Sequence, residues 1–195
     1  MGANVGGHDH ADDAGAQLGA GLEAELGLGM FTVGGELGYD SYALLDGVPV
    51  HSTSIAGRAG IAVPLAEDHT DRTIKVAAIS SLELGVHHYS PEGERKELLG
   101  GSTDYYGNEA SSRFLGTRAG AAITIHPKNS TTDFIWKLEL VGRRDFRTVD
   151  LEYDRVNCGG LFLNDNDCSA VSHGMTMVGG TELGVTTSIG VAFGK

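Results

Sequence analysis

The sequence lacks any apolar run of the roughly 18 residues that a transmembrane helix needs, so no such helix is predicted. A β-strand crosses a bilayer with only about 9–11 residues of alternating character, and a membrane location therefore stays open. The first residues contain neither a positively charged segment nor an apolar one, and no signal peptide is recognisable. For a protein of the outer membrane, we expect this sequence to be the mature form.

Basic residues are scarce, with 14 Lys and Arg against 26 Asp and Glu and a net charge of −12. No basic cluster could neutralise phosphates, which argues against nucleic acid as a partner. Proline occurs only 4 times, whereas glycine occurs 30 times, about twice its usual share of roughly 7%. Glycine inside a strand is tolerated where the backbone bends or is closely approached, and a narrow barrel requires both.

Cysteine is nearly absent: Cys158 and Cys168 enclose a short polar segment, Gly159–Asp167. Their spacing does not suit zinc, and no second Cys/His pair lies nearby in the sequence. In an oxidising compartment we expect a disulfide within one loop, stabilising the fold by up to about 2–3 kcal/mol. Two free thiols of a cytosolic protein are the alternative.

Seven segments alternate between an apolar face without charge and a second face with charges of both signs. This alternation predicts β-strands with one face in nonpolar surroundings. The apolar faces span Leu18–Leu28, Phe31–Tyr39, Ile55–Leu65, Ile74–Val86, Leu115–Ile125, Phe134–Leu140 and Leu183–Phe193. The opposite faces carry Glu23, Glu25, Glu36, Arg58, Lys75, Glu83, Arg118, Lys137, Glu139, Arg143 and Glu182.

A closed sheet that is apolar outside and polar inside is typical of transmembrane β-barrels. We therefore predict an all-β, antiparallel, up-and-down transmembrane barrel of about eight strands over residues 17–195. Its interior charges should pair, because an unpaired charge in a poorly hydrated lumen is costly. The alternative is a soluble lipocalin-like barrel, in which the apolar faces would line a ligand cavity and the charges would lie outside.

Seven strands leave an even-numbered barrel one short, and we expect the eighth in a long connection, at Val149–Tyr153 or Gly160–Phe162. The change of phase at Met30/Phe31 is interpreted as a turn, with a β-bulge as the alternative. Short connections at 66–72 and 127–131 alternate with long polar loops at 89–112 and 149–173. Outer-membrane barrels show this contrast between short periplasmic turns and long extracellular loops.

Residues 1–16 form a Gly/Ala/Asp-rich segment that we expect to be a disordered tail. The segment contains side chains that commonly ligate metals, but without structure to fix their geometry we predict no metal site there. These side chains are His8, Asp9, His10, Asp12 and Asp13.

The whole pattern resembles the small eight-stranded outer-membrane barrels of Gram-negative bacteria, the OmpA, OmpX and OmpW type. The last strand is similar to the C-terminal assembly signal of that superfamily, with Thr186 as its polar start and Val191 and Phe193 as its apolar pair. It departs in having Ser188 where glycine is expected and in continuing to Lys195. The resemblance implies an outer-membrane location and contact with outer-membrane lipid.

Two segments could carry chemistry. His88 and Ser90 are two residues apart on one strand face and could form an imidazole–hydroxyl pair for acyl transfer. They resemble the His-x-Ser element of outer-membrane lipid A deacylases, although Pro91 follows where that family has asparagine. Asn164–Asp167 offers oxygen ligands for Ca²⁺ but lacks the glycine and distal glutamate of an EF-hand loop. We interpret the first as a polar strand end and the second as a solvated acidic loop.

The predicted function is thus non-enzymatic, without cofactor or metal: a barrel that is structural, or that presents its long loops to a protein partner. Three alternatives remain. They are a narrow channel for small solutes, a lipid-modifying hydrolase through His88 and Ser90, and a soluble ligand-binding barrel.

Overall fold

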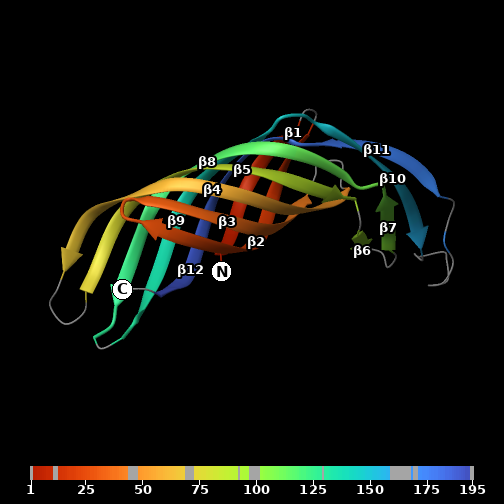
Figure 1. The fold of residues 1–195 in the computed structure, drawn as a ribbon. Helices are drawn as coiled ribbons and strands as arrows, with labels where there is room; N and C mark the ends of the chain where they lie inside the picture. Colours follow the sequence, from red (N-terminus) through yellow and green to blue (C-terminus); the bar gives the residue numbers. More distant parts are fainter. Residues whose placement is uncertain are drawn as a thin grey trace.

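The computed structural model describes residues 2–10, 13–43, 48–68, 73–91, 93–96, 102–128, 130–158, 168 and 171–193. Every regular element in these ranges is a β-strand, and all strand pairs are antiparallel. The strands form two sheets, one closed into a barrel and one open (Figure 1). The all-β, antiparallel fold that the alternation predicts is therefore confirmed.

Eight strands follow one another around the barrel, each hydrogen-bonded to two neighbours. The ring keeps the order of the chain and closes where β1 pairs with both β2 and β12. Its members are β1 (Gly2–His10), β2 (Asp13–Leu28), β3 (Phe31–Ala43), β4 (Pro49–Asp68), β5 (Thr73–Ser90), β8 (Ala110–His126), β9 (Thr132–Asp145) and β12 (Gly180–Phe193).

The N-terminal segment differs from its prediction. Instead of a disordered tail, Gly2–His10 forms β1, and β2 begins at Asp13 rather than after the tail. This segment supplies the eighth strand that we had expected in a long connection. Its backbone is held by pairing on both sides, which requires no apolar alternation in its own sequence.

The phase change after the first alternating segment is a turn, as predicted, and not a bulge. β2 ends at Leu28, and the chain reverses through Gly29 and Met30 before β3. Gly29 has φ of +68°, a left-handed conformation that glycine adopts without steric cost. A register irregularity does occur elsewhere, between Pro64 and Ala66, where β4 pairs with β5.

The two long connections are not simply loops. They contribute β6 (Gly93–Lys96), β7 (Ser102–Gly107), β10 (Val149–Cys158) and β11 (Ser172–Val178), which form a second sheet in the order β11-β10-β7-β6. Val149–Tyr153, expected as a barrel strand, belongs to this sheet, and Gly160–Phe162 lies outside the described residues. Figure 1 shows the second sheet extending from one end of the barrel, while the β4–β5 pair and the β8–β9 pair extend at the other end.

The barrel is polar inside and apolar outside. Glu83 is 2% exposed, whereas its neighbour Leu84 is 57% exposed, and this alternation recurs along the barrel strands. The exposed set includes Leu22, Leu37, Ile55, Leu138, Leu140, Leu183 and Ile189. The inverted, lipocalin-like arrangement is therefore wrong, because its apolar faces would have to line the interior.

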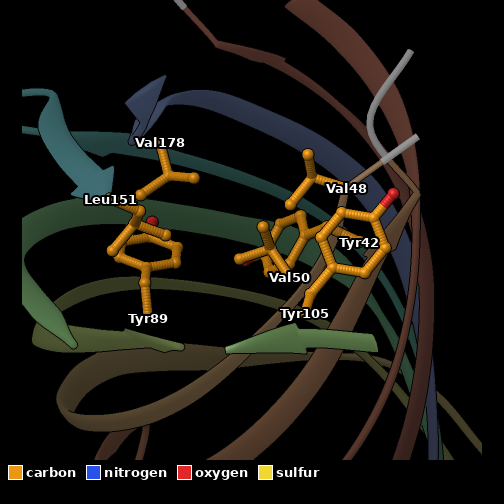
Figure 2. Packing of buried hydrophobic residues seen from close by; sticks show 7 residues of the cluster. All are labelled: Tyr42, Val48, Val50, Tyr89, Tyr105, Leu151 and Val178. Atoms are coloured by element: carbon orange, nitrogen blue, oxygen red, sulfur yellow. The ribbon is translucent and has the colours of Figure 1, made fainter. Parts of the chain in front are cut away.

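The buried apolar core is small and lies between the barrel end and the second sheet (Figure 2). From the barrel side it contains Tyr42, Val50 and Tyr89, and from the second sheet Tyr105, Leu151 and Val178, together with Val48. Leu151 and Tyr89 are completely buried. The second sheet thus packs onto the barrel at this end.

Candidate functional site

The centre of the barrel interior is occupied by a network of two carboxylates and two guanidinium groups. The Glu83 carboxylate accepts hydrogen bonds from Nε of Arg118 at 2.9 Å and from Nε of Arg143 at 2.5 Å. The Glu83 side chain is fully buried. Glu36 pairs with both arginines as well, through their Nη2 atoms. Each buried charge therefore has at least two partners of opposite sign, which offsets the cost of removing it from water.

A second network fills the lumen nearer the β2–β3 turn. Arg58 binds Glu23 at 3.0 Å and Glu25 at 2.9 Å through Nη2, and Lys137 lies 3.0 Å from Glu23 and 3.3 Å from Glu25. The charged groups that line an adjoining cavity of about 20 Å³ are Glu25, Arg58, Lys137 and Glu139. This volume is room for about one water molecule.

The predicted interior charges thus lie inside the barrel with one exception. Glu139 is 4% exposed and lies 3.8 Å from Arg118, and Glu182 is also 4% exposed. Lys75, however, is directed to solvent: its side chain is 56% exposed and pairs with Glu67, its partner in the strand register. Both lie beyond the Pro64/Ala66 irregularity, toward the end of the strands, where the barrel interior no longer covers them.

Glycines make room for the large interior groups. A Cβ at Gly116 would come within 2.5 Å of the Glu83 side chain, and one at Gly85 would lie 2.5 Å from the Phe114 ring. Each glycine lies on the inward face, so the crowding arises from the convergence of side chains in a narrow lumen. These two positions allow Glu83 and Phe114 to occupy the axis of the barrel.

A third buried cluster, which the sequence did not lead us to expect, lies close to the second sheet. His87, Asp145 and Glu182 each offer a ligand atom within 4.8 Å of the others, and they are 0%, 7% and 4% exposed. They come from β5, β9 and β12. Continuation of the inward alternation would have found two of them, since His87 follows Glu83 by four residues and Asp145 follows Arg143 by two.

Hydrogen bonds and ring contacts fix the geometry of this cluster. His87 Nδ1 lies 3.3 Å from Asp145 Oδ1, and the Tyr89 hydroxyl donates to Asp145 Oδ2 at 3.0 Å. Tyr42 donates to Glu182 Oε1 at 2.8 Å. The imidazole also stacks on the ring of Phe114, with a distance of 4.2 Å between the ring centroids. The His87 ring is therefore held in one orientation.

The outward pair proposed from the sequence is arranged differently. No hydrogen bond joins the described side chains of His88 and Ser90, and the Ser90 hydroxyl is buried without a hydrogen-bond partner. His88 instead contacts Ser111 Oγ through Nδ1 at 2.9 Å and Glu109 Oε2 through Nε2 at 3.0 Å. The imidazole side chain is 45% exposed. The side chains that contact His88 thus come from Ser111 and Glu109, and not from Ser90 on the same strand.

The second sheet bears a concave surface, and the hollow that this surface lines has a volume of about 730 Å³. Its lining includes Tyr106, Glu152, Tyr153, His173 and Met175, from β7, β10 and β11. Tyr106 and Met175 are 57% and 65% exposed, so apolar surface is available next to charged groups. Such a mixture of aromatic and polar groups is suited to contact with a ligand or another protein.

Cys158 and Cys168 form a disulfide with an S–S distance of 2.09 Å. The bond connects the end of β10 to Cys168, across the connection that leads to β11. The acidic segment Asn164–Asp167 lies outside the described residues, as do the side chains of residues 1–16, including the potential ligands there.

The chain resembles a solved structure, whereas comparison with protein families gives no match. No family model matches the chain, and no curated protein matches it. Among solved structures, the chain is similar to a major outer membrane protein from Thermus thermophilus, with 13% identity and a TM-score of 0.32 over 95% of this chain and 96% of that one. In the part of the chain that the structure describes, no helix is both long and apolar enough to span a membrane.

Proposed function

We propose that the protein is an outer-membrane β-barrel with a structural, ion-paired interior and a binding surface on its second sheet. One observation carries the proposal: the charged side chains in the middle of the barrel strands lie inside, while large apolar side chains cover the outside. A soluble protein rarely exposes a contiguous apolar patch larger than a few hundred Å². Leucine, isoleucine and valine side chains exposed on the barrel strands from β2 to β12 instead fit a lipid environment.

Refolding into phospholipid vesicles tests this location. The protein is refolded into vesicles or kept in buffer without detergent, and its migration on a gel is compared before and after boiling. We expect a compact, heat-modifiable species that sediments with the vesicles. A monodisperse, folded protein in buffer without any amphiphile would contradict the proposal.

The interior favours a closed barrel over a channel for small solutes. Paired carboxylates and guanidinium groups fill the middle of the lumen, and the adjoining cavity holds about one water molecule. The side chains block the route as long as these pairs persist. The barrel therefore acts as a scaffold rather than as a passage.

The second sheet is the part of the scaffold that we assign to partner binding. It is anchored to the barrel by the core around Leu151 and Tyr89, and it presents the concave surface at Tyr106 and Met175. Replacement of Tyr106 and Met175 by serine should abolish binding of the partner without changing the heat-modifiable migration. The matched control is Val171→Ser, because Val171 is 51% exposed but does not line the concave surface.

A second candidate function rests on the hydrogen bonds of His88. A carboxylate at Nε2 holds the imidazole proton there, so Nδ1 can accept the proton of the Ser111 hydroxyl as this oxygen attacks an ester carbonyl. The C–O bond of the ester then breaks, and the imidazolium gives this proton to the departing alcohol. Water hydrolyses the acyl-serine and restores the Ser111 hydroxyl. Lipid mass analysis after expression tests this function, with His88→Ala, Ser111→Ala and Ser90→Ala compared. Loss of an acyl chain that depends on His88 and Ser111, but not on Ser90, would establish hydrolase activity through this group.

A further inference from the structure

We propose that His87 and Glu182 bind a divalent transition-metal ion inside the barrel, with Asp145 as the residue that orients the histidine. The inference is independent of the membrane location and of the partner surface. It rests on the geometry of three buried side chains at the barrel end that the second sheet covers.

Two buried polar atoms face each other without partners. His87 Nε2 and Glu182 Oε2 both lack a hydrogen bond, and they are 4.0 Å apart. An unsatisfied buried polar atom costs about 1–3 kcal/mol, so a pair of them in one place requires an explanation. A metal ion bound to both atoms would satisfy them.

The orientation of the imidazole suits a metal ligand. Asp145 Oδ1 and the Tyr89 hydroxyl lie within hydrogen-bond distance of His87 Nδ1. A proton on Nδ1 leaves Nε2 with a lone pair, and Nε2 faces Glu182. A carboxylate on the far nitrogen of a metal-binding histidine fixes its tautomer and raises its basicity. Tyr42 holds the other oxygen of Glu182, so that Oε2 is the free ligand.

The distances are close to those of a metal site. Tetrahedral bonds of about 2.1 Å place two ligand atoms about 3.4 Å apart. The observed 4.0 Å between Nε2 and Oε2 is wider by a few tenths of an ångström. A small side-chain rotation closes this difference.

The charge balance also favours a cation. The carboxylates of the two central ion-pair networks, and Glu139, pair with Arg58, Arg118, Lys137 or Arg143. Arg143 lies opposite Glu182 in the β9–β12 register and attracts it electrostatically, but its guanidinium group is hydrogen-bonded to Glu83 and Glu36. Among the described residues, Asp145 and Glu182 form ion pairs within 4.0 Å with His87 and with no lysine or arginine. A divalent ion would neutralise both carboxylates. Imidazole with carboxylate ligands is a set that Zn²⁺ and related ions bind well.

The test measures metal retained by the full chain, refolded in detergent with its disulfide intact and stripped with EDTA. Zn²⁺ is added during refolding or afterwards, and bound metal is measured after gel filtration. Co²⁺ is used as the spectroscopic probe. We expect one equivalent of Zn²⁺ and visible Co²⁺ absorption bands of a site with nitrogen and oxygen ligands.

Variants assign the ligands. Glu182→Gln and His87→Asn should each weaken binding at least about 10-fold, and Asp145→Asn should weaken it by about 10- to 100-fold, as is typical of an orienting residue. If His87→Asn does not fold, the nearly isosteric Glu182→Gln decides. Glu139→Gln is the matched control for a buried carboxylate, and His88→Ala controls for the exposed imidazole beside Glu109.

Three results would overturn the proposal. The first is the absence of retained metal in the unmodified protein under both loading conditions. The second is undiminished binding by Glu182→Gln. The third is binding that disappears in a variant with His8→Ala and His10→Ala, or in His88→Ala, while Glu182→Gln retains it.

Discussion

Replacement of Glu83 by glutamine should destabilise the barrel strongly, because this side chain neutralises two buried guanidinium groups. Its carboxylate is fully buried and binds Arg118 at 2.9 Å and Arg143 at 2.5 Å. Removing one partner of a buried ion pair costs about 3–5 kcal/mol. Both arginines keep Glu36 as a second partner, so we expect the lower end of this range, about 3 kcal/mol.

The matched control is Glu67→Gln. Glu67 also pairs with a cation, Lys75, but the two side chains are 40% and 56% exposed. An exposed pair contributes about 0–1 kcal/mol, so this variant should unfold almost as the unmodified protein does. The comparison isolates the effect of burial, since the chemical change is the same.

Urea unfolding in a fixed detergent or lipid measures both variants, with the fluorescence of the single tryptophan as the signal. Glu83→Gln should lower the midpoint clearly, while its slope stays unchanged. Equal midpoints for Glu83→Gln and Glu67→Gln would refute the reasoning, because the interior would then be hydrated enough to screen its charges.

The outer face, the disulfide and the lumen can each be tested as well. Leu84→Arg and Leu138→Arg, on the outward face, should each cost about 2–4 kcal/mol if they lie near the bilayer midplane, measured by unfolding from vesicles; tolerance of both would contradict a lipid-facing surface. Intact mass spectrometry of unreduced protein should show the loss of two hydrogens at Cys158 and Cys168, and two alkylatable thiols would contradict the disulfide. In planar bilayers the protein should give only rare, small openings, and a stable ionic conductance would show that the interior pairs do not close the lumen.

The alternation of the sequence predicted the strands whose outer face is apolar, because each of these strands has an uninterrupted row of apolar side chains. β1 has no such row. Its segment, Gly2–His10, offers Val5 as its only large aliphatic side chain and is rich in glycine. The strand is specified by the backbone groups that β2 and β12 leave for pairing, and a periodicity search does not detect such a signal.

The residues around His88 show why spacing along one strand is a weak guide to contacts. Side chains two residues apart on a strand are separated by about 6.6–7 Å along the chain. Residues directly opposite on neighbouring strands have Cβ atoms only about 4.5–5.5 Å apart. Ser111 is the residue opposite His88 in the β5–β8 register, and it takes the hydrogen bond expected for Ser90. Register cannot be derived from one strand alone.

The long connections were predicted as loops because they are polar and rich in glycine, asparagine and aspartate. They nevertheless build a sheet. β8 and β9 are paired in the barrel, and the short links β7–β8 and β9–β10 bring β7 and β10 side by side, where they pair as well. Burial of Tyr105, Leu151 and Val178 against the barrel end then stabilises the sheet. The few apolar residues responsible are spaced too widely in the sequence to be recognised as a core.

The most direct test of a barrel that is polar inside and faces lipid outside uses Trp136, the single tryptophan of the chain. This side chain lies on the outer face of β9 and is 45% exposed, between Phe134 and Leu138 on the same face. The protein is refolded into vesicles of ordinary phospholipid and into vesicles whose acyl chains carry bromine. We predict blue-shifted emission that the brominated acyl chains quench strongly. Emission typical of water, and unchanged by bromine, would contradict a barrel whose apolar surface faces lipid.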